Sequence, residues 1–289
     1  MSPAPKTVLC IHDLPGFGRA GLSVIVPILS AMGVQAVAVP TAVLSTHTGG
    51  LGAPARLTSP GYGPAALAHY RRLGLKFDCI YSGYLSETSQ ALLVEQAIEY
   101  WPDALAVVDP VMGDNGRMYS GLPAEMVPAL YTLCSHADII LPNATEAALL
   151  LGDAPPAANA ATPAYAAEAA ARLTRLCPQV LLTGTAAGHS MVCSGAVRGG
   201  EGYTVRTPLL PRPFHGTGDI FGAVFVGRLL QGNVAAAAAQ AAALFGGDCL
   251  RATPAGAGER YGVWLGNGLP KLHPRCRLSA AGAARTRKT

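Results

Sequence analysis

Lysine is scarce in this sequence of 289 residues, which holds only four, at positions 6, 76, 271 and 288. None of them follows a glycine-rich turn between a predicted strand and a predicted helix, and no GxxxxGK[ST] segment occurs. The sequence therefore excludes a P-loop nucleotide-binding site.

Long apolar runs are also missing. No stretch reaches the roughly 20 apolar residues that a membrane-spanning helix needs, and no basic-then-apolar leader precedes the first predicted strand. Charged residues make up 13% of the chain and hydrophobic residues 50%, a composition that argues against disorder. We therefore expect a folded, cytoplasmic protein with no membrane partner.

Cysteine pairs with metal-binding spacing are absent as well. The seven cysteines are scattered, their number is odd, and none forms a CxxC motif. Neither a zinc site nor a disulfide framework is predicted.

The net charge of +4 comes from one end of the chain. Six of the 21 basic residues lie in 271–289, which has no acidic residue, so the rest of the chain holds 15 basic against 17 acidic residues. A nucleic-acid interface needs basic residues clustered on the folded body, and none is predicted here. We expect one domain over residues 1–270 and a basic, partly disordered tail over 271–289.

What the sequence does contain is a regular alternation of short apolar runs and helix-length segments. The predicted strands are 7–11, 35–40, 79–81, 104–108, 138–141 and 180–182, and the predicted helices are 22–32, 65–73, 86–101, 125–135, 145–151, 166–176, 220–230 and 234–249. Residues 191–193 and 203–205 are predicted to form an antiparallel pair at the sheet edge, and 51–63 and 113–123 to form loops. This order predicts an α/β fold with a mostly parallel central sheet and helices on both faces.

Polar residues stand where six of these strands end. They are Asp13, 45–47, 82–84, Asp109, Asn143 with Glu146, and Thr183. In open α/β sheets, ligands bind outside the carboxyl ends of the strands, so this series predicts a ligand site at one edge of the sheet.

The segment His215-Gly216-Thr217-Gly218-Asp219 leads into an apolar segment of helical length. The first amides of a helix have no internal partner and carry the positive end of its dipole, so the turn predicts an anion-binding site. Asp219 then places a proton acceptor beside that anion. The ordinary alternative is that Asp219 only caps a buried helix.

Carboxylates at the same edge suit a magnesium ion, which takes few protein ligands and several water or phosphate oxygens. The candidates are Asp109, Glu146 and Asp138. In the ordinary alternative, Asp109 caps a turn and Glu146 is a first-turn helix carboxylate. An anion site, metal carboxylates and a base together describe phosphoryl transfer from a nucleotide to a hydroxymethyl group.

A dinucleotide site was the other possibility, because Gly16, Gly18 and Gly21 match the GxGxxG spacing. However, the first strand is predicted to end at His12 and Asp13, before these glycines, and no acidic residue ends the second strand. A nicotinamide enzyme is therefore disfavoured.

Taken together, these motifs resemble the ribokinase-like superfamily and, within it, the vitamin B6 kinases (pyridoxal and pyridoxamine kinases). Gly216-Thr217-Gly218-Asp219 is typical of the whole superfamily, whereas Ser45-Thr46-His47-Thr48-Gly49 with Ser82-Gly83-Tyr84 is specific to the B6 kinases. The other matching segments are 11–13 with 18–19, 109–114 and 138–146. The resemblance implies a three-layer α/β/α sandwich.

The resemblance also implies roles for individual residues. Asp219 would be the base that deprotonates the 5′-hydroxyl of the pyridine substrate, and Gly216, Thr217 and Gly218 would form the anion hole. The remaining positions would be Asn143, Glu146, Asp109 and Thr183 for ATP, Asp109 and Glu146 for Mg²⁺, and Asp13, His47, Thr48 and Tyr84 for the pyridine pocket. Residues 113–123 would be the lid over ATP, and the family is commonly a homodimer. A monovalent cation is left open as a further cofactor.

Two departures from the family pattern bear on the substrate. Many pyridoxal kinases carry serine where this chain has Asp13, and a carboxylate there favours pyridoxamine or broad B6 specificity. Family members that also accept hydroxymethylpyrimidine can place a cysteine on the lid, but 113–123 contains none. The alternatives are a hydroxymethylpyrimidine kinase of thiamine metabolism and a non-catalytic B6-binding protein. Nucleoside and sugar kinases fit the segment around His47 poorly.

Overall fold

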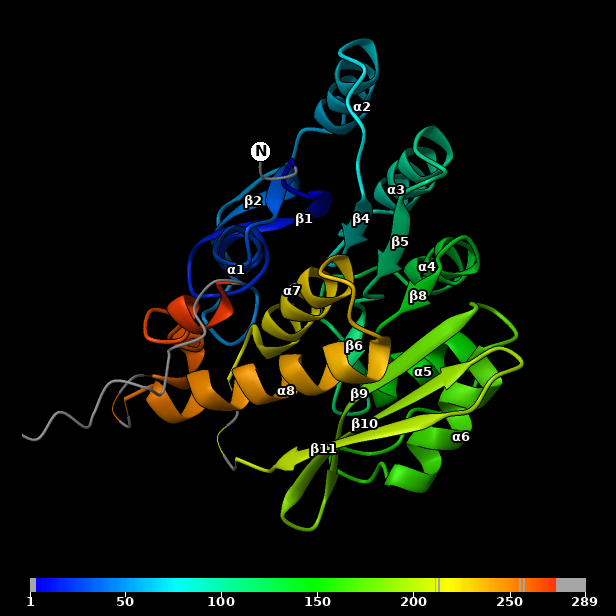
Figure 1. Cartoon of the computed structure of the whole chain (residues 1–289), viewed down its shortest axis with the longest axis vertical. Coiled ribbons are helices and arrows are strands. Elements are labelled where there is room, and N and C mark those ends of the chain that lie inside the picture. Colours follow the sequence, from blue (N-terminus) through cyan, green and yellow to red (C-terminus); the bar gives the residue numbers. More distant parts are fainter. Residues whose placement is uncertain (1–3, 211, 213, 255, 257, 274–289) are drawn as a thin grey trace, which may run out of the picture.

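The protein is described by a computed structural model that covers residues 4–210, 212, 214–254, 256 and 258–273. Its centre is a nine-stranded sheet with the order β11-β10-β9-β8-β5-β4-β1-β2-β3 (Figure 1). Apart from residues 271–273, the predicted basic tail lies outside the described residues.

The sheet strands are β1 Thr7–Phe17, β2 Gln35–Thr46, β3 Arg56–Leu57, β4 Cys79–Ser82, β5 Leu105–Val108, β8 Ile139–Ile140, β9 Gln179–Ala187, β10 Ser190–Val197 and β11 Tyr203–Pro208. A separate hairpin consists of β6 Gly113–Asp114 and β7 Arg117–Met118. The helices are α1 Leu22–Ala31, α2 Tyr62–Arg72, α3 Thr88–Tyr100, α4 Met126–Ser135, α5 Ala144–Leu151, α6 Pro163–Leu173, α7 Thr217–Leu230 and α8 Ala235–Ala252, followed by the short 3₁₀ helices η1 Glu259–Tyr261 and η2 Leu269–Leu272.

Helices cover both faces of the sheet. Alternate residues of each strand point to opposite faces, so each strand contributes to two cores. In β1, Leu9 and Ile11 enter a core built with helices α2 to α6. Val8 and Cys10 enter a second core built with α1, α7 and α8. The predicted three-layer α/β/α sandwich is therefore confirmed.

The strand directions also follow the prediction. The pairs β2–β1, β1–β4, β4–β5, β5–β8 and β8–β9 are parallel. Strands β9, β10 and β11 pair antiparallel, so the predicted antiparallel pair at the edge of the sheet is confirmed.

The first two strands run further than predicted, and their predicted ends at Ile11 and Pro40 are wrong. Strand β4 pairs with β1 only as far as Ile11, whereas β2 stays paired with β1 out to Phe17. Beyond Ile11 one side of β1 is free, so Pro15 can lie in the strand without removing a ladder hydrogen bond. The outer parts of β1 and β2 therefore form a two-stranded ribbon beside the site.

The ribbon carries two further irregularities. The β1–β2 register shifts between His12 and Leu14, which places His12 and Asp13 at a bulge rather than at a strand end. The predicted loop 51–63 contains the short strand β3, which pairs antiparallel with Val43 and Leu44 of β2.

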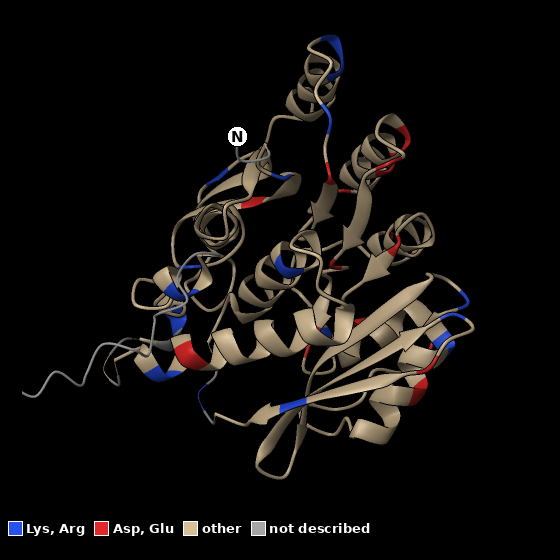
Figure 2. Ribbon diagram, viewed as in Figure 1, with Lys and Arg blue, Asp and Glu red and all other residues tan. Residues whose placement is uncertain are grey.

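The charged residues are spread over separate elements of the fold in the view of Figure 2.

None of the helices in the described part of the chain is long and apolar enough to cross a membrane. The six cysteines in that part are buried and free.

Candidate active site

The turn that was predicted to bind an anion lies at the start of α7. Gly216 takes a left-handed conformation with φ of 78°, and a Cβ atom there would lie 2.0 Å from the carbonyl oxygen of Arg19. Only glycine therefore fits. Thr217 and Gly218 are exposed at the first turn, where helix amide groups lack intrahelical partners.

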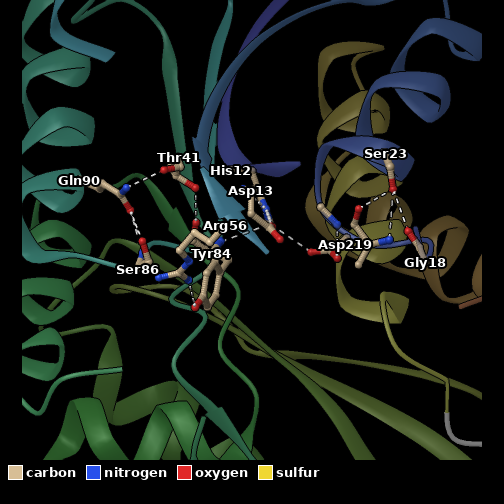
Figure 3. Close-up of polar contacts among 12 residues, drawn as sticks. His12, Asp13, Gly18, Ser23, Thr41, Arg56, Tyr84, Ser86, Gln90 and Asp219 are labelled. Atoms are coloured by element: carbon tan, nitrogen blue, oxygen red, sulfur yellow. Dashed lines mark hydrogen bonds and ion pairs between the residues drawn. The ribbon is translucent and has the colours of Figure 1, made fainter. Parts of the chain in front are cut away.

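Asp219 lies in the same turn and is held by two donors from the region of β1 and α1 (Figure 3). Its Oδ2 accepts a hydrogen bond from the Gly21 amide at 2.7 Å, and its Oδ1 lies 3.1 Å from Nε2 of His12. Burial favours the neutral acid, but the charge and hydrogen bond of His12 and the Gly21 amide outweigh it and lower the pKa of Asp219. Asp219 is therefore kept as a carboxylate.

His12 has carboxylates at both ring nitrogens. Its Nδ1 lies 2.6 Å from Oδ1 of Asp13, and its Nε2 faces Asp219. Burial disfavours the imidazolium, yet Asp219 and Asp13 outweigh burial and raise the pKa of His12 to about 10. The sequence analysis assigned His12 no role. The available signal was a histidine next to Asp13 where a buried strand was predicted to end.

Asp109 and Glu146 form a buried acidic pair near Asp219. Burial, followed by the charge of Asp219, raises the pKa of Asp109 to about 7, and His12 acts in the opposite direction. Burial and the nearby Asp109 also raise the pKa of Glu146. The structure thus brings Asp109, Glu146 and Asp219 into one electrostatic unit.

Glu146 also caps its own helix. Its Oε2 accepts a hydrogen bond from the Asn143 amide at 2.9 Å, while Oδ1 of Asn143 accepts from the Thr145 and Glu146 amides. This reciprocal pair is a capping box. Oε1 of Glu146 accepts from the Met112 amide at 3.1 Å. Glu146 is therefore a first-turn helix carboxylate, as the ordinary alternative stated, and it also lies close to Asp109.

The loop predicted to be a lid is tied to the start of α5. Nδ2 of Asn143 donates to the Gly113 carbonyl at 2.7 Å, and the Gly116 amide donates to Oγ1 of Thr145 at 2.9 Å. Thr183 lies beside them, because it forms a bridge with Asn143. The predicted nucleotide residues Asn143, Glu146 and Thr183 are thus neighbours.

The carboxylates suit a magnesium ion that is held mostly by water and phosphate. Asp109 and Glu146 are two buried acids whose mutual repulsion a divalent cation would relieve. Among the described residues no group of three or more His, Cys, Asp or Glu could hold a metal alone. The prediction for Asp138 is wrong. Asp138 precedes β8 and therefore lies at the amino end of the sheet, at the opposite edge from residues that follow a strand. Its Oδ2 accepts a hydrogen bond from the Ala106 amide at 2.8 Å.

Tyr84, predicted to line the pyridine pocket, also lies beside His12 (Figure 3). Its amide lies 3.3 Å from Nε2 of His12, and its hydroxyl accepts a hydrogen bond from Nη2 of Arg56 at 3.3 Å. Its carbonyl accepts from Oγ1 of Thr41 at 3.0 Å. Arg56 was not predicted as a site residue, because it lies in a segment predicted to be a loop.

His47 is buried and makes its contacts with other segments than His12. Nδ1 of His47 accepts from the Gly49 amide at 3.0 Å, and Nε2 faces the Arg260 carbonyl, so both ring nitrogens are occupied within the protein. The ring lies 4.9 Å from that of His215, centroid to centroid, with the two planes tilted by 37°. Thr48 is exposed. Asp13 and Tyr84 therefore lie together at His12, whereas His47 supports the C-terminal segment.

Comparison with known proteins places this site in a family. Residues 17–263 match the phosphomethylpyrimidine kinase family. The chain is 33% identical to the pyridoxal kinase PdxY of Deinococcus radiodurans, over 78% of this chain and 80% of that protein. It is 30% identical to the pyridoxine/pyridoxal/pyridoxamine kinase of Bordetella bronchiseptica, over 90% of this chain and 94% of that one.

A solved structure agrees with these relatives. A protein from Bacteroides thetaiotaomicron, assigned as a phosphomethylpyrimidine kinase and crystallised with pyridoxal, superimposes with a TM-score of 0.86 at 36% identity, over 93% of this chain and 96% of that one. The chain belongs to the phosphomethylpyrimidine kinase family and, within it, to the pyridoxal kinases of the ribokinase-like fold.

Proposed function

We propose that this protein is a vitamin B6 kinase, which transfers the γ-phosphoryl group of ATP to the 5′-hydroxymethyl group of pyridoxal, pyridoxamine or pyridoxine. The observation that carries the proposal is the position of Asp219. It lies in the first turn of α7, beside the anion-binding amides, and is held as a carboxylate by His12 and Gly21.

In this mechanism Asp219 accepts the proton of the substrate hydroxyl as that oxygen attacks the γ-phosphorus. A new oxygen–phosphorus bond forms, the bond to the leaving ADP oxygen breaks, and the proton remains on Asp219. The amides of residues 216–218 stabilise the negative charge on the transferring group. Geometry and charge together supply the catalysis, because little covalent chemistry is asked of the protein.

Asp109 and Glu146 are the residues that would hold Mg²⁺ with the ATP phosphates. The ion would neutralise charge on the β- and γ-phosphates. Asn143 and Thr183 would position the nucleotide, and the loop 113–123 would exclude water that could otherwise take the phosphoryl group. The support for this arrangement is the contact of the loop with Asn143 and Thr145.

Broad B6 specificity fits the pocket better than a strong preference for pyridoxamine. The argument for pyridoxamine rested on a free carboxylate at Asp13, which would attract an amine. In the structure Oδ1 of Asp13 lies 2.6 Å from Nδ1 of His12, so this oxygen already has a partner before a substrate arrives. Asp13, Tyr84 and Arg56 would then surround the pyridine ring.

The test is ATP-dependent phosphorylation of pyridoxal, pyridoxamine, pyridoxine and hydroxymethylpyrimidine by the wild type and Asp219→Asn. We expect B6 turnover in the wild type and a fall in kcat of about 100-fold or more in the variant, because asparagine keeps the shape but cannot accept the proton. Asp103→Asn, at an exposed position far from the anion turn in sequence, is the matched control. No turnover of any B6 vitamer by the wild type would refute the proposal.

Hydroxymethylpyrimidine kinase is the second candidate, favoured by the family name that residues 17–263 match. Turnover of the pyrimidine alone would assign the protein to thiamine metabolism with the same mechanism. A homodimer remains a proposal that rests on the family resemblance, and a cytoplasmic location remains a proposal that rests on the sequence. Light scattering of the purified protein would test the homodimer.

A further inference from the structure

We propose that His12 is a positioning residue for the base, held as an imidazolium between Asp13 and Asp219 and keeping Asp219 oriented and ionised. The inference rests on the proposed function, since it assumes that Asp219 is the base. It assigns Asp13 mainly to His12 rather than to the substrate.

The first argument is geometric. Oδ1 of Asp13 lies 2.6 Å from Nδ1 of His12, and Oδ1 of Asp219 lies 3.1 Å from Nε2. A neutral imidazole carries one N–H, so it would turn a lone pair toward one of the two carboxylates. Only the imidazolium donates to both.

Two backbone amides also point at the ring. The Asp13 amide directs its N–H at Nδ1 at 2.9 Å and the Tyr84 amide directs its N–H at Nε2 at 3.3 Å, so each ring nitrogen faces both an amide donor and a carboxylate. At each nitrogen the carboxylate oxygen is nearer than the amide. A carboxylate accepts only, so the short contact with Asp13 requires a proton between the two atoms.

The surrounding chain is shaped to hold the ring in this place. His12 is only 2% exposed. A Cβ atom at Gly83 would lie 2.0 Å from Nε2 of His12, so the glycine of the Ser-Gly-Tyr segment makes the room that the ring occupies. With carboxylates at both nitrogens and Gly83 against its edge, the ring is fixed on three sides.

The chemical reason for a cation here is the accumulation of negative charge. Asp219 shares its surroundings with Asp109 and would share them with the phosphates of ATP, and like charges favour protonation of a carboxylate. A protonated Asp219 could not accept the substrate proton. His12 offsets that repulsion, and the weaker base that results is sufficient because phosphoryl transfer has a loose transition state.

The prediction for pH dependence involves every titratable group near this pair. These are Asp13, Asp219, Asp109, Tyr81, His47 and Tyr119. In the wild type, Asp219 stays ionised to low pH. In His12→Gln, which keeps a hydrogen-bond donor without the charge, the acid limb of the kcat/KM profile should move up by about one pH unit or more.

The direct test needs no activity. Long-range ¹H–¹⁵N correlation spectra report which imidazole nitrogens carry protons, and His12→Gln assigns the His12 signals. At about pH 8, where an ordinary histidine is neutral, we expect both nitrogens of His12 to be protonated. We also expect the pKa of His12 to fall in Asp13→Asn. A single protonated nitrogen at that pH would overturn the inference.

The kinetic test compares His12→Gln with His136→Gln, which changes an exposed histidine at the end of α4. We expect His12→Gln to lower kcat about 10- to 100-fold, with KM for ATP unchanged and the acid limb shifted, and the control to behave as wild type. An unshifted profile in folded His12→Gln would contradict a positioning role.

Two further results separate the possible failures. If His12→Gln does not fold, the wild-type and Asp13→Asn spectra still decide the charge of His12. If the wild type phosphorylates no B6 vitamer, the proposed function fails, while the ring protonation is still judged on its own.

Asp13→Asn should also leave the ratio of kcat/KM for pyridoxamine and pyridoxal nearly unchanged. A large shift of this ratio toward pyridoxal would show that Asp13 selects the substrate.

Discussion

At the scale of single residues, the site holds one imidazole among three carboxylates. Asp13, His12, Asp219 and Asp109 follow one another across the carboxyl edge of the sheet. Against the effect of burial, the two flanking carboxylates raise the pKa of His12 and His12 lowers the pKa of Asp219, whereas burial followed by the charge of Asp219 raises the pKa of Asp109. A buried ion pair adds little net stability, but removal of one partner leaves an uncompensated charge. The central histidine therefore matters for both folding and function.

His12 should make stability depend on pH. Its pKa is about 10 in the folded protein against 6.5 for an ordinary histidine. Its contribution is therefore fully present below pH 6.5 and is lost as the pH rises through 10, since only the folded state holds the extra proton in between. Urea unfolding of wild type and His12→Gln should show a difference in unfolding free energy that shrinks with rising pH across this window. A constant difference would contradict the imidazolium.

At the scale of elements, the order and type of most helices and strands followed from the sequence. Alternating apolar runs fixed the parallel sheet, and the turn 215–219 was found by its glycines. The extension of β1 through Pro15 could not be predicted, because it depends on β4 leaving one side of the strand free beyond Ile11. Arg56 was missed because two residues of β3 give no periodic signal.

The candidate site, like the fold, was predictable in part, because the order of the strands shows which residues follow them. Strand ends gave Asp109, Asn143 and Thr183, which the fold places at one edge. Asp138 was misassigned although it begins the predicted strand 138–141, a position that already places it at the amino end of the sheet. His12 needed three dimensions, because its partner Asp219 lies more than 200 positions away in the chain.

The capping box of α5 offers a test at this scale. Asn143→Ala should lower stability by about 1 kcal/mol through loss of the cap, and it should raise KM for ATP because the Gly113 carbonyl loses its donor. Asn143→Asp keeps the acceptor and should restore stability but not KM. Thr162→Ala removes the cap of α6 and serves as the control, with lower stability and unchanged KM. Equal KM in all four proteins would refute the link to the loop.

At the scale of the whole molecule, the C-terminal segment is fastened to the site. Nη1 of Arg19 donates to the carbonyls of Tyr261 at 3.2 Å and Gly262 at 3.1 Å, and its guanidinium stacks on Trp264 at 4.6 Å. His47 faces the neighbouring Arg260 carbonyl. Arg19 lies two positions before Gly21, whose amide holds Asp219. Residues 260–264 are therefore connected to Asp219 through a few residues.

Arg19→Ala should loosen this connection. We expect a loss of about 1 to 3 kcal/mol in unfolding free energy and a higher KM for the B6 vitamer, because hydrogen bonds from a charged donor are among the stronger ones. Arg198→Ala is the matched control, since Arg198 also donates to two backbone carbonyls, those of Thr174 and Arg175, on another part of the fold. The same KM in both variants would show that the segment does not reach the pocket.

The contact between Gly83 and His12 has a consequence for which sequences this fold can accept. A methyl group at position 83 and an imidazole at position 12 compete for the same space. The residues at these two positions, 71 apart in the sequence, therefore cannot be substituted independently of each other. A chain with a smaller or more flexible side chain at position 12 can carry a side chain at position 83, whereas a chain with histidine at position 12 must keep glycine at position 83.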